Sequence, residues 1–570
     1  MRDQYSKLAL IWNELYPGEP TGVLEDFIDE MRQFTAGLSL PPLEDEWYRD
    51  AVVYSLYVDL FNADFRGLTD KLDYLQDLGV NCIWLLPVLD SPMRDAGFDI
   101  SHYRKIRREL AGLDETASDK EVQDVFQNFL FEAHRRGLRV IFDIATNHVS
   151  DQHHWFQEAC KSKDNPYRDY FIWSKTGKEY AGARIIFKGI EESNWKKEDD
   201  EYFFHRFFDF QPDLNYRNPR VLIEMSRNLL FWLERGVDGF RADAIPYIWK
   251  EEGTTCENLP KTHTVVKFFR AVIDIARPNI LLLAEACQKP HEVVKYFGDN
   301  DECNAGYHFP LMPQMFKAVA MESRGPVLST LSPAVTPEIP AGTQWFTFLR
   351  CHDELSLELV YVTEEDRKYI HETYCRKPEW DFRLGQGISA RLSELMERNP
   401  DRIGLIFSIM LTLPGTPVVY YGDEFGKLND EDYYEEMKKV IGKDDTRFLV
   451  RGKIDWPEVE AKLSQPGSYE SEVFNRIRKM LQARNAAGVF GRGEITWLDF
   501  IHTDGRPADE IMAYTRKKGD HEVMVLQNLS GKAVTLRWDR GFKASLLENK
   551  PLFSQGMINL APYEYFWLSV

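Results

Sequence analysis

The stretch Gly236-Val237-Asp238-Gly239-Phe240-Arg241-Ala242-Asp243 decides the fold, because it is typical of a short buried strand that ends in charged residues. Arg241 and Asp243 are two positions apart, so an extended strand directs both side chains to the same side. A guanidinium beside a carboxylate lowers the pKa of that carboxylate and holds it ionised, which suits a nucleophile. A single Arg-x-Asp is more often a structural ion pair, so the rest of the chain has to decide.

Short apolar strands and amphipathic helices alternate on both sides of this stretch. Seven strands are predicted, at residues 51–58, 80–86, 138–144, 236–243, 280–284, 345–350 and 416–421. Repeated strand-helix units with short apolar strands imply a parallel sheet, and about eight such units close a barrel. We therefore predict an α/β protein built on a (β/α)8 TIM barrel.

Three regions depart from this alternation. Residues 150–215 are aromatic, charged and irregular, which indicates a subdomain inserted after the third strand. A helical lid is predicted after the seventh strand, with Tyr369, Tyr374 and Trp380 as its candidate aromatic contacts to substrate. Alternating runs near the end predict an antiparallel β-sandwich. The predicted domains are an N-terminal helical segment 1–47, a catalytic barrel 48–149 and 216–490, the inserted subdomain 150–215, the lid insertion 355–399 and the C-terminal β-sandwich 491–570.

The composition indicates a globular protein with a large core, since 44% of the 570 residues are hydrophobic. The net charge of -21 opposes binding to nucleic acid or anionic lipid, and solubility explains it most simply. The chain start has no apolar leader segment and no apolar run is long enough to span a bilayer, so we expect a cytoplasmic protein without a membrane partner. The seven cysteines contain no Cys-x-x-Cys pair, which predicts free thiols and neither a disulfide framework nor a zinc site.

Polar side chains follow the ends of four predicted strands, at the edge where barrel active sites lie. They are Asp143 with Asn147 and His148, Arg241 with Asp243, Glu285, and His352 with Asp353. Carboxylates that converge on one rim repel one another unless a cation or a sugar compensates them. This convergence favours catalysis over a structural network. Glu285 lies in apolar sequence, which should raise its pKa and keep it protonated near neutrality.

These motifs resemble the four signature regions of the α-amylase family of retaining glycoside hydrolases and glucosyltransferases. Residues 143–148, 239–243, Glu285 within Ala-Glu-Ala, and His352-Asp353 match those regions in order, and residues 211–215 are similar to an auxiliary motif. The similarity extends over about residues 48–570. It implies that Asp243 is the nucleophile, Glu285 the general acid/base and Asp353 the carboxylate that stabilises the transition state. It also implies that His148 and His352 bind the same sugar ring and that Arg241 orients Asp243.

Within this family the chain is most similar to the trehalose synthases, through stretches such as 169–173, 183–187 and 256–260. Residues 57–61 and 445–456 look more like amylosucrase. Phe98 stands where relatives commonly have a tyrosine under the sugar ring, and Cys351 where an asparagine usually precedes the histidine. The resemblance implies that Asp95 pairs with an arginine at the closed end of the sugar pocket. We predict Arg451 for this role, with Arg447 as the rival.

The resemblance suggests one metal, a calcium ion held by Asn147 and Asp213, and otherwise no required cofactor. The loop at residues 62–64 lacks the Asp- and Gly-rich sequence that binds calcium in many relatives.

The leading functional hypothesis is interconversion of maltose and trehalose by intramolecular glucosyl transfer. An α-glucosidase and a sucrose-acting, amylosucrase-like transglucosidase are the alternatives within the family. A catalytically inactive binding or scaffold protein is an alternative of another class, disfavoured because Asp243, Glu285 and Asp353 are all present. The expected partners are small α-glucosides (maltose, trehalose, sucrose), and the sequence leaves open whether the chain forms a homo-oligomer.

Overall fold

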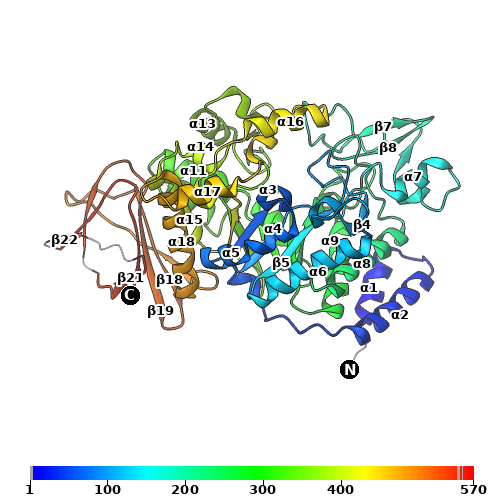
Figure 1. Ribbon diagram of the computed structural model, residues 1–570, viewed down its shortest axis with the longest axis horizontal. Helices are drawn as coiled ribbons and strands as arrows, with labels where there is room; N and C mark the ends of the chain where they lie inside the picture. The colour runs from blue at the N-terminus through cyan, green and yellow to red at the C-terminus, as the bar shows by residue number, and fades with distance from the viewer. Residues whose placement is uncertain (1–3, 539, 548–551, 555) are drawn as a thin grey trace.

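The computed structural model describes residues 4–538, 540–547, 552–554 and 556–570 (Figure 1). Residues 1–3, at the chain start for which no leader segment is expected, lie outside the described residues. The barrel occupies the middle of the molecule, with the C-terminal strands at one end and the N-terminal helices α1 (Ser6–Leu15) and α2 (Gly22–Gly37) toward the other. No helix in the described ranges combines the length and apolar character needed to cross a membrane.

Eight parallel strands close the predicted barrel, in the order β1-β16-β12-β11-β10-β9-β5-β2. The strands are β1 (Val53–Leu56), β2 (Cys82–Leu85), β5 (Arg139–Ala145), β9 (Gly239–Asp243), β10 (Leu281–Ala284), β11 (Ala305–Tyr307), β12 (Gln344–Phe348) and β16 (Thr416–Tyr420). The strand β11 was not among the seven that the sequence predicts. Its three residues are too few to show a period, whereas the longer apolar strands do.

Strand β9 lies between β5 and β10, where neighbouring backbones approach closely. Its first residue, Gly239, has no room for a side chain, because a Cβ there would lie 2.6 Å from Leu281 Cβ and 2.9 Å from Ile141 Cγ2. The register pairs Arg241 with Asp143 on β5. Strand β9 therefore brings its arginine beside a carboxylate of the neighbouring strand.

Helices surround the barrel, and their starts carry the sequence signals expected of helix ends. Ser118 and Glu121 form a capping box at the start of α6, and Asn218 caps α8 just before Pro219. The barrel helices are α4 (Phe65–Asp70), α5 (Leu72–Leu78), α6 (Asp119–Arg135), α8 (Pro219–Glu234), α9 (Pro260–Ala276), α11 (Leu311–Ala320), α15 (Pro400–Thr412) and α18 (Tyr469–Ala487). Further helices lie in the connections, namely α3 (Val58–Asn62), α10 (Pro290–Val293), α12 (Gly325–Thr330), α16 (Glu431–Ile441) and α17 (Trp456–Leu463).

Long connections rise from the barrel after β2, β5 and β12. The first contains the hairpin of β3 (Leu89–Asp90) and β4 (His102–Ile106). The second contains α7 (His154–Lys161) and a sheet of β6 (Trp173–Ser174), β7 (Trp195–Glu198) and β8 (Glu201–Phe204). The third contains α13 (Glu364–Tyr374), α14 (Leu392–Leu395) and a sheet of β13 (Leu355–Ser356), β14 (Asp381–Phe382) and β15 (Gly387–Ile388). The third connection is thus less helical than expected, because strands of two residues leave no alternating pattern in the sequence.

The chain ends in two antiparallel sheets with an apolar core between them, as predicted. The larger sheet has the order β17-β18-β19-β24-β21 and the smaller one β20-β23-β22. Apolar side chains of both sheets, including Leu526, Leu536 and Ile558, form the shared core. The strands are β17 (Glu494–Trp497), β18 (Ile511–Lys518), β19 (His521–Asn528), β20 (Val534–Arg537), β21 (Ala544–Ser545), β22 (Leu552–Ser554), β23 (Met557–Leu560) and β24 (Tyr565–Ser569).

Candidate active site

Arg241 lies at the centre of three carboxylates at the carboxyl end of the barrel. Its Nη1 is 2.6 Å from Asp143 Oδ1 and 2.5 Å from Asp243 Oδ1. Its Nη2 forms an ion pair with Glu285 Oε1. Asp143 lies near the end of β5, Asp243 ends β9 and Glu285 follows β10. These strands are adjacent, so the barrel itself sets the spacing of the three carboxylates. We call these four residues, Asp143, Arg241, Asp243 and Glu285, the catalytic cluster.

Burial raises the pKa of every carboxyl group in this cluster, and Arg241 opposes the rise each time. The pKa reaches about 6 for Asp243, about 7 for Asp143 and about 8 for Glu285. The expectation that Arg241 would lower the pKa of Asp243 below its ordinary value is wrong, because one guanidinium shared among three buried carboxylates does not outweigh desolvation. The order of these pKa values still suits catalysis, because near neutrality Asp243 is mostly ionised and Glu285 is mostly protonated.

The backbone after β9 supports Glu285 directly. Ala244 has a φ of 54°, a left-handed conformation in which the chain turns sharply just after Asp243. Its backbone N–H donates to Glu285 Oε2 at 3.0 Å. On the other side of the cluster the indole of Trp84 donates to Asp143 Oδ2 at 2.8 Å. Both carboxylates are therefore fixed by donors from rigid elements.

A pocket opens beside the catalytic cluster, with about 870 Å³ of empty space including its mouth. Its wall combines polar groups with aromatic rings. The lining residues with polar side chains are Asp95, His148, Asp243, Tyr247, Glu285, His352, Asp353, Glu354, Ser356, Glu358, Arg383 and Arg447, and the aromatic ones also include Phe98, Phe187, Phe207, Phe309 and Phe382.

The floor of the pocket pairs Asp95 with Arg447, not with Arg451 as predicted. Arg447 Nη2 lies 3.4 Å from Asp95 Oδ1, and Arg447 lines the pocket. Arg451 donates through Nε to the backbone oxygen of His352 at 2.9 Å and lies 3.3 Å from Asp353 Oδ1. Arg451 therefore supports the loop after β12 and does not line the pocket. Asp445 immediately precedes the 3₁₀ turn Thr446–Val450, and its two carboxylate oxygens accept hydrogen bonds from Arg447 Nε and Nη2. These bonds hold the Arg447 guanidinium toward the pocket.

Asp353 differs from the catalytic cluster in its charge balance. Burial would raise its pKa, but His352, Arg447 and Arg451 outweigh that effect and hold the pKa well below its usual value. Arg447 Nη1 lies 3.0 Å from Asp353 Oδ1. Asp353 is consequently ionised throughout the neutral range. Such a carboxylate can stabilise positive charge that develops on a sugar.

His148, His352 and Phe98 all line the pocket, as the sequence suggests. The rings of Phe98 and His352 stack with centroids 5.3 Å apart. Burial lowers the pKa of His148 to about 4 and that of His352 to about 3, so both are neutral hydrogen-bonding groups.

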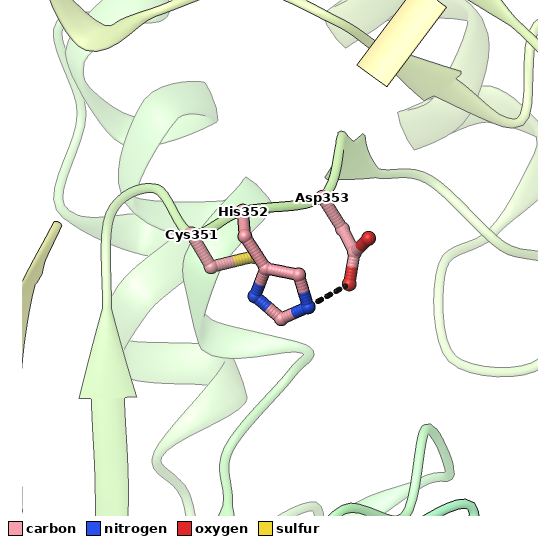
Figure 2. A group of neighbouring side chains, drawn as sticks. All are labelled: Cys351, His352 and Asp353. Carbon is pink, nitrogen blue, oxygen red and sulfur yellow. Dashed lines mark ion pairs between the residues drawn. The ribbon is translucent and has the colours of Figure 1, made fainter. Parts of the chain in front are cut away.

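Cys351, His352 and Asp353 follow β12 consecutively, and Figure 2 shows their side chains turned toward one another. His352 Nε2 lies 3.1 Å from Asp353 Oδ2. Within the described ranges they form the one cluster of His, Cys and carboxylate groups close enough to hold a metal ion. Burial raises the pKa of Cys351 to about 12, so its thiol stays protonated and is a poor metal ligand. All seven cysteines are free thiols, as predicted.

A lysine side chain occupies the position of the calcium ion that the resemblance suggests. Lys250 Nζ lies 2.6 Å from Asn147 Oδ1 and 2.7 Å from Asp213 Oδ2, between the two expected ligands. The residues present therefore do not fit a calcium ion, because an ammonium group already neutralises Asp213. No sequence pattern marks Lys250, which lies seven positions after Asp243 in an irregular segment without a motif.

The insertion after β12 contributes Phe382 and Arg383 to the pocket instead of the expected Tyr369, Tyr374 and Trp380. Tyr374 is buried and donates to the backbone oxygen of Phe316, which places it on the barrel side of α13. Phe382 lies in strand β14 and Arg383 in the turn after it, so a search for helical aromatic residues could not have found them. A Gly-rich turn around 385–387 was the signal available in the sequence.

The model of the α-amylase catalytic domain matches residues 41–377, and that of the C-terminal domain of the α-amylase SusG matches residues 511–564. The chain is 41% identical over 530 residues to a trehalose synthase/amylase, TreS, of Mycolicibacterium smegmatis, which covers 86% of this chain and 85% of the relative. It is 39% identical over 528 residues to a trehalose synthase of Pimelobacter sp., covering 85% and 88%. The structure of a trehalulose synthase, MutB, from Pseudomonas mesoacidophila is similar in fold, with a TM-score of 0.68, 23% identity and coverage of 93% and 100%.

Proposed function

Since the chain belongs to the α-amylase family, we propose that it is a retaining glucosyl-transferring enzyme that interconverts maltose and trehalose. The similarity to relatives named trehalose synthase over most of the chain carries the choice of substrate. The arrangement of Asp243 and Glu285 around Arg241 carries the choice of reaction.

In the first step Glu285 acts as the acid and Asp243 as the nucleophile. The carboxylate of Asp243 attacks the anomeric carbon while the proton of Glu285 passes to the glycosidic oxygen. The bond from the anomeric carbon to that oxygen breaks, and an ester bond to Asp243 forms. Free glucose and a glucosyl-enzyme result. The difference between a pKa of about 6 and one of about 8 supports this division of roles.

In the second step the released glucose turns and its anomeric hydroxyl attacks the glucosyl-enzyme. Glu285, now a carboxylate, accepts the proton of that hydroxyl, and the ester bond to Asp243 breaks. Two anomeric carbons joined through one oxygen are trehalose, and the reverse sequence gives maltose. In this scheme Asp353 stays ionised and stabilises the cationic sugar in both steps, while Arg447 and Asp95 bind its outer hydroxyls.

The mouth of the pocket supports retention of the glucose between the steps. Glu358, in the insertion after β12, lies 2.6 Å from Arg383 Nη2 and 3.4 Å from Arg184 Nη1 of the other insertion. Arg383 Nη1 also donates to the backbone oxygen of Ile186 at 3.0 Å. The two insertions are thus tied together over the site, which would keep bulk water from the glucosyl-enzyme.

Two other activities use the same cluster, and products distinguish them. Hydrolysis of the glucosyl-enzyme would make the protein an α-glucosidase, and sucrose as donor would make it an amylosucrase-like transglucosidase. A binding or scaffold role would not require the different pKa values of Asp243 and Glu285. We expect no cofactor, because Asp243 and Glu285 supply both the nucleophile and the proton.

The test is to incubate the protein separately with maltose, trehalose and sucrose in the presence of isotopically labelled free glucose. We expect maltose to give trehalose, and the reverse, with little label in either disaccharide and no turnover of sucrose. Complete conversion of maltose to glucose would contradict the proposal in favour of hydrolysis. Release of fructose from sucrose would contradict it in favour of the transglucosidase.

A further inference from the structure

The segment after β9 places a lysine ammonium at a buried position between two oxygen ligands. Lys250 is 3% exposed, and Asn147 and Asp213 are fully buried. Its Nζ lies 2.6 Å from Asn147 Oδ1, 2.7 Å from Asp213 Oδ2 and 3.5 Å from the backbone oxygen of Ile248. Oxygen ligands surround calcium at about 2.3–2.6 Å, so the nitrogen lies close to where such an ion would lie.

We infer that the Lys250 ammonium is a built-in replacement for calcium in this chain, and that it holds His148 in the orientation in which it meets the sugar. The role of Lys250 as the cation at this site does not depend on which disaccharide is the substrate.

The charges at the site leave no place for a divalent ion beside Lys250. Asp213 supplies one negative charge, and the ammonium neutralises it. Its other oxygen, Oδ1, accepts a hydrogen bond from the backbone N–H of Arg206 at 2.9 Å. Burial lowers the pKa of Lys250, and contact with Asp213 opposes that shift. Removing either partner would leave the other as a buried unpaired charge, which a fold tolerates poorly.

The same contact fixes a residue of the sugar pocket. Because Asn147 Oδ1 accepts from Lys250, its amide nitrogen must face the other way, and it lies 3.3 Å from His148 Nδ1. His148 Nδ1 is then the acceptor, which leaves the proton of the neutral ring on Nε2. His148 lines the pocket. Lys250 is therefore a positioning residue that sets the tautomer of His148 through Asn147.

The first experiment uses the wild-type protein. We expect gel-filtered protein to contain no stoichiometric calcium by elemental analysis, and its Tm and its KM for maltose to be unchanged by EGTA or by added calcium chloride. One calcium per chain, together with a lower Tm in EGTA, would overturn the inference.

The second experiment rebuilds a calcium site by the substitution Lys250→Glu. Three side chains with oxygen ligands would then surround the position, and we expect EGTA to lower the Tm and added calcium to restore it in a saturable way. The KM for maltose should rise in EGTA and recover with calcium, since the ion would again hold Asn147 and hence His148. Lys261→Glu is the matched control, because Lys261 lies on the outer helix α9, where its Nζ donates to the backbone oxygen of Leu15 and lies over the ring of Trp249. It should show no response to calcium.

A third variant, Lys250→Met, keeps the length of the side chain and removes its charge. We expect a lower Tm, a KM for maltose raised by several-fold, and a weaker response to calcium than that of Lys250→Glu. If Lys250→Met matches the wild type in both Tm and KM, the ammonium is unnecessary and the inference fails. If Lys250→Glu folds but does not bind calcium, and added calcium does not raise its Tm, the position is not a cation site.

Discussion

Two groups of buried charged residues lie at the pocket, and the pKa values of their carboxyl groups are shifted in different directions. The catalytic cluster has one guanidinium, that of Arg241, for three carboxylates. The floor cluster, which we define as Asp95, Asp353, Asp445, Arg447 and Arg451, has two guanidinium groups for three carboxylates. The pKa values are raised throughout the first cluster, whereas burial is outweighed and the pKa lowered for Asp353 and Asp445 in the second.

The exception within the floor cluster shows what decides the outcome. Asp95 has its pKa raised to about 7 by burial, although it belongs to the same cluster. It meets Arg447 only at 3.4 Å, whereas Asp445 bonds Arg447 at 2.6 Å and Asp353 contacts two arginines. Since burial raises the pKa of all these carboxyl groups, the balance between the nearby cations and the nearby carboxylates separates a group that exchanges protons from one that stays charged.

The largest effect should follow loss of the nucleophile from the catalytic cluster. Asp243→Ala should reduce kcat/KM for maltose on the order of 10⁴-fold or more, because no other carboxylate can form the ester. A fluorinated glucosyl donor should label Asp243 in the wild type, as read by peptide mass spectrometry. Asp274→Ala, on the outer helix α9, is the control and should keep full activity. Label on Asp353 would reverse the roles assigned to the two clusters, and label on Asp143 would make a different carboxylate of the catalytic cluster the nucleophile.

Loss of the proton donor should have a large but substrate-dependent effect. Glu285→Gln should lower turnover of maltose by roughly 10²–10⁴-fold, since its leaving group needs the proton. An aryl glucoside with an acidic phenol leaves without one, so its first step should be spared. Steady-state rates on both substrates check this. Equal loss on the two would mean that Glu285 is not the acid.

The floor cluster should respond to substitution through binding of the terminal sugar. Arg447→Ala removes a charged hydrogen-bond donor from the pocket, which is worth about 1.5–3 kcal/mol, or roughly a ten- to hundredfold loss in kcat/KM for maltose. Arg451→Ala should cost less activity and more stability, because Arg451 supports the backbone behind the pocket. Kinetics and Tm of both variants make the comparison. A larger catalytic loss for Arg451→Ala would restore the assignment that the sequence suggests.

The pH dependence of the wild type tests the different charge balance directly. Activity needs Asp243 ionised, a form that is lost as the pH falls through about 6, and Glu285 protonated, a form that is lost as the pH rises through about 8. A plot of kcat/KM for maltose should therefore be bell-shaped, falling about tenfold per pH unit beyond each limb. Asp353 should contribute no limb in this range, because its pKa lies far below. A flat profile between about pH 5 and about pH 9 would contradict the raised values.

Sequence patterns were sufficient for the parts of the molecule that repeat. Apolar strands of four or more residues predict the barrel, and residues at the carboxyl ends of such strands must meet at one rim. Asp143, Asp243, Glu285 and Asp353 could therefore be grouped from the sequence. The three-residue strand β11 and the two-residue strands of the insertions have no detectable period. Their positions follow from tertiary contacts alone.

The roles of residues in the long connections were harder to predict, because the direction in which their side chains point depends on local turns. Arg447 and Arg451 are four positions apart in the sequence, and only the 3₁₀ turn between them shows which one enters the pocket. Lys250 has no motif around it, and its meaning depends on two partners that lie 103 and 37 positions earlier in the chain. The pKa of Asp243 was predicted in the wrong direction for a related reason. A single Arg-x-Asp in the sequence does not show how many carboxylates share the arginine.

The smallest effect concerns the contact between the two insertions, which encloses both clusters. Arg383→Ala removes the ion pair to Glu358 and the hydrogen bond to Ile186, so water should reach the glucosyl-enzyme more often. We expect the ratio of free glucose to trehalose formed from maltose to rise several-fold, while consumption of maltose changes little. Arg376→Ala is the matched control, because Arg376 lies in the same insertion but pairs with Glu397 outside the pocket. Chromatography of the products measures the ratio. If both variants give the wild-type ratio, the contact between the insertions does not exclude water, and the two clusters alone must favour transfer to glucose.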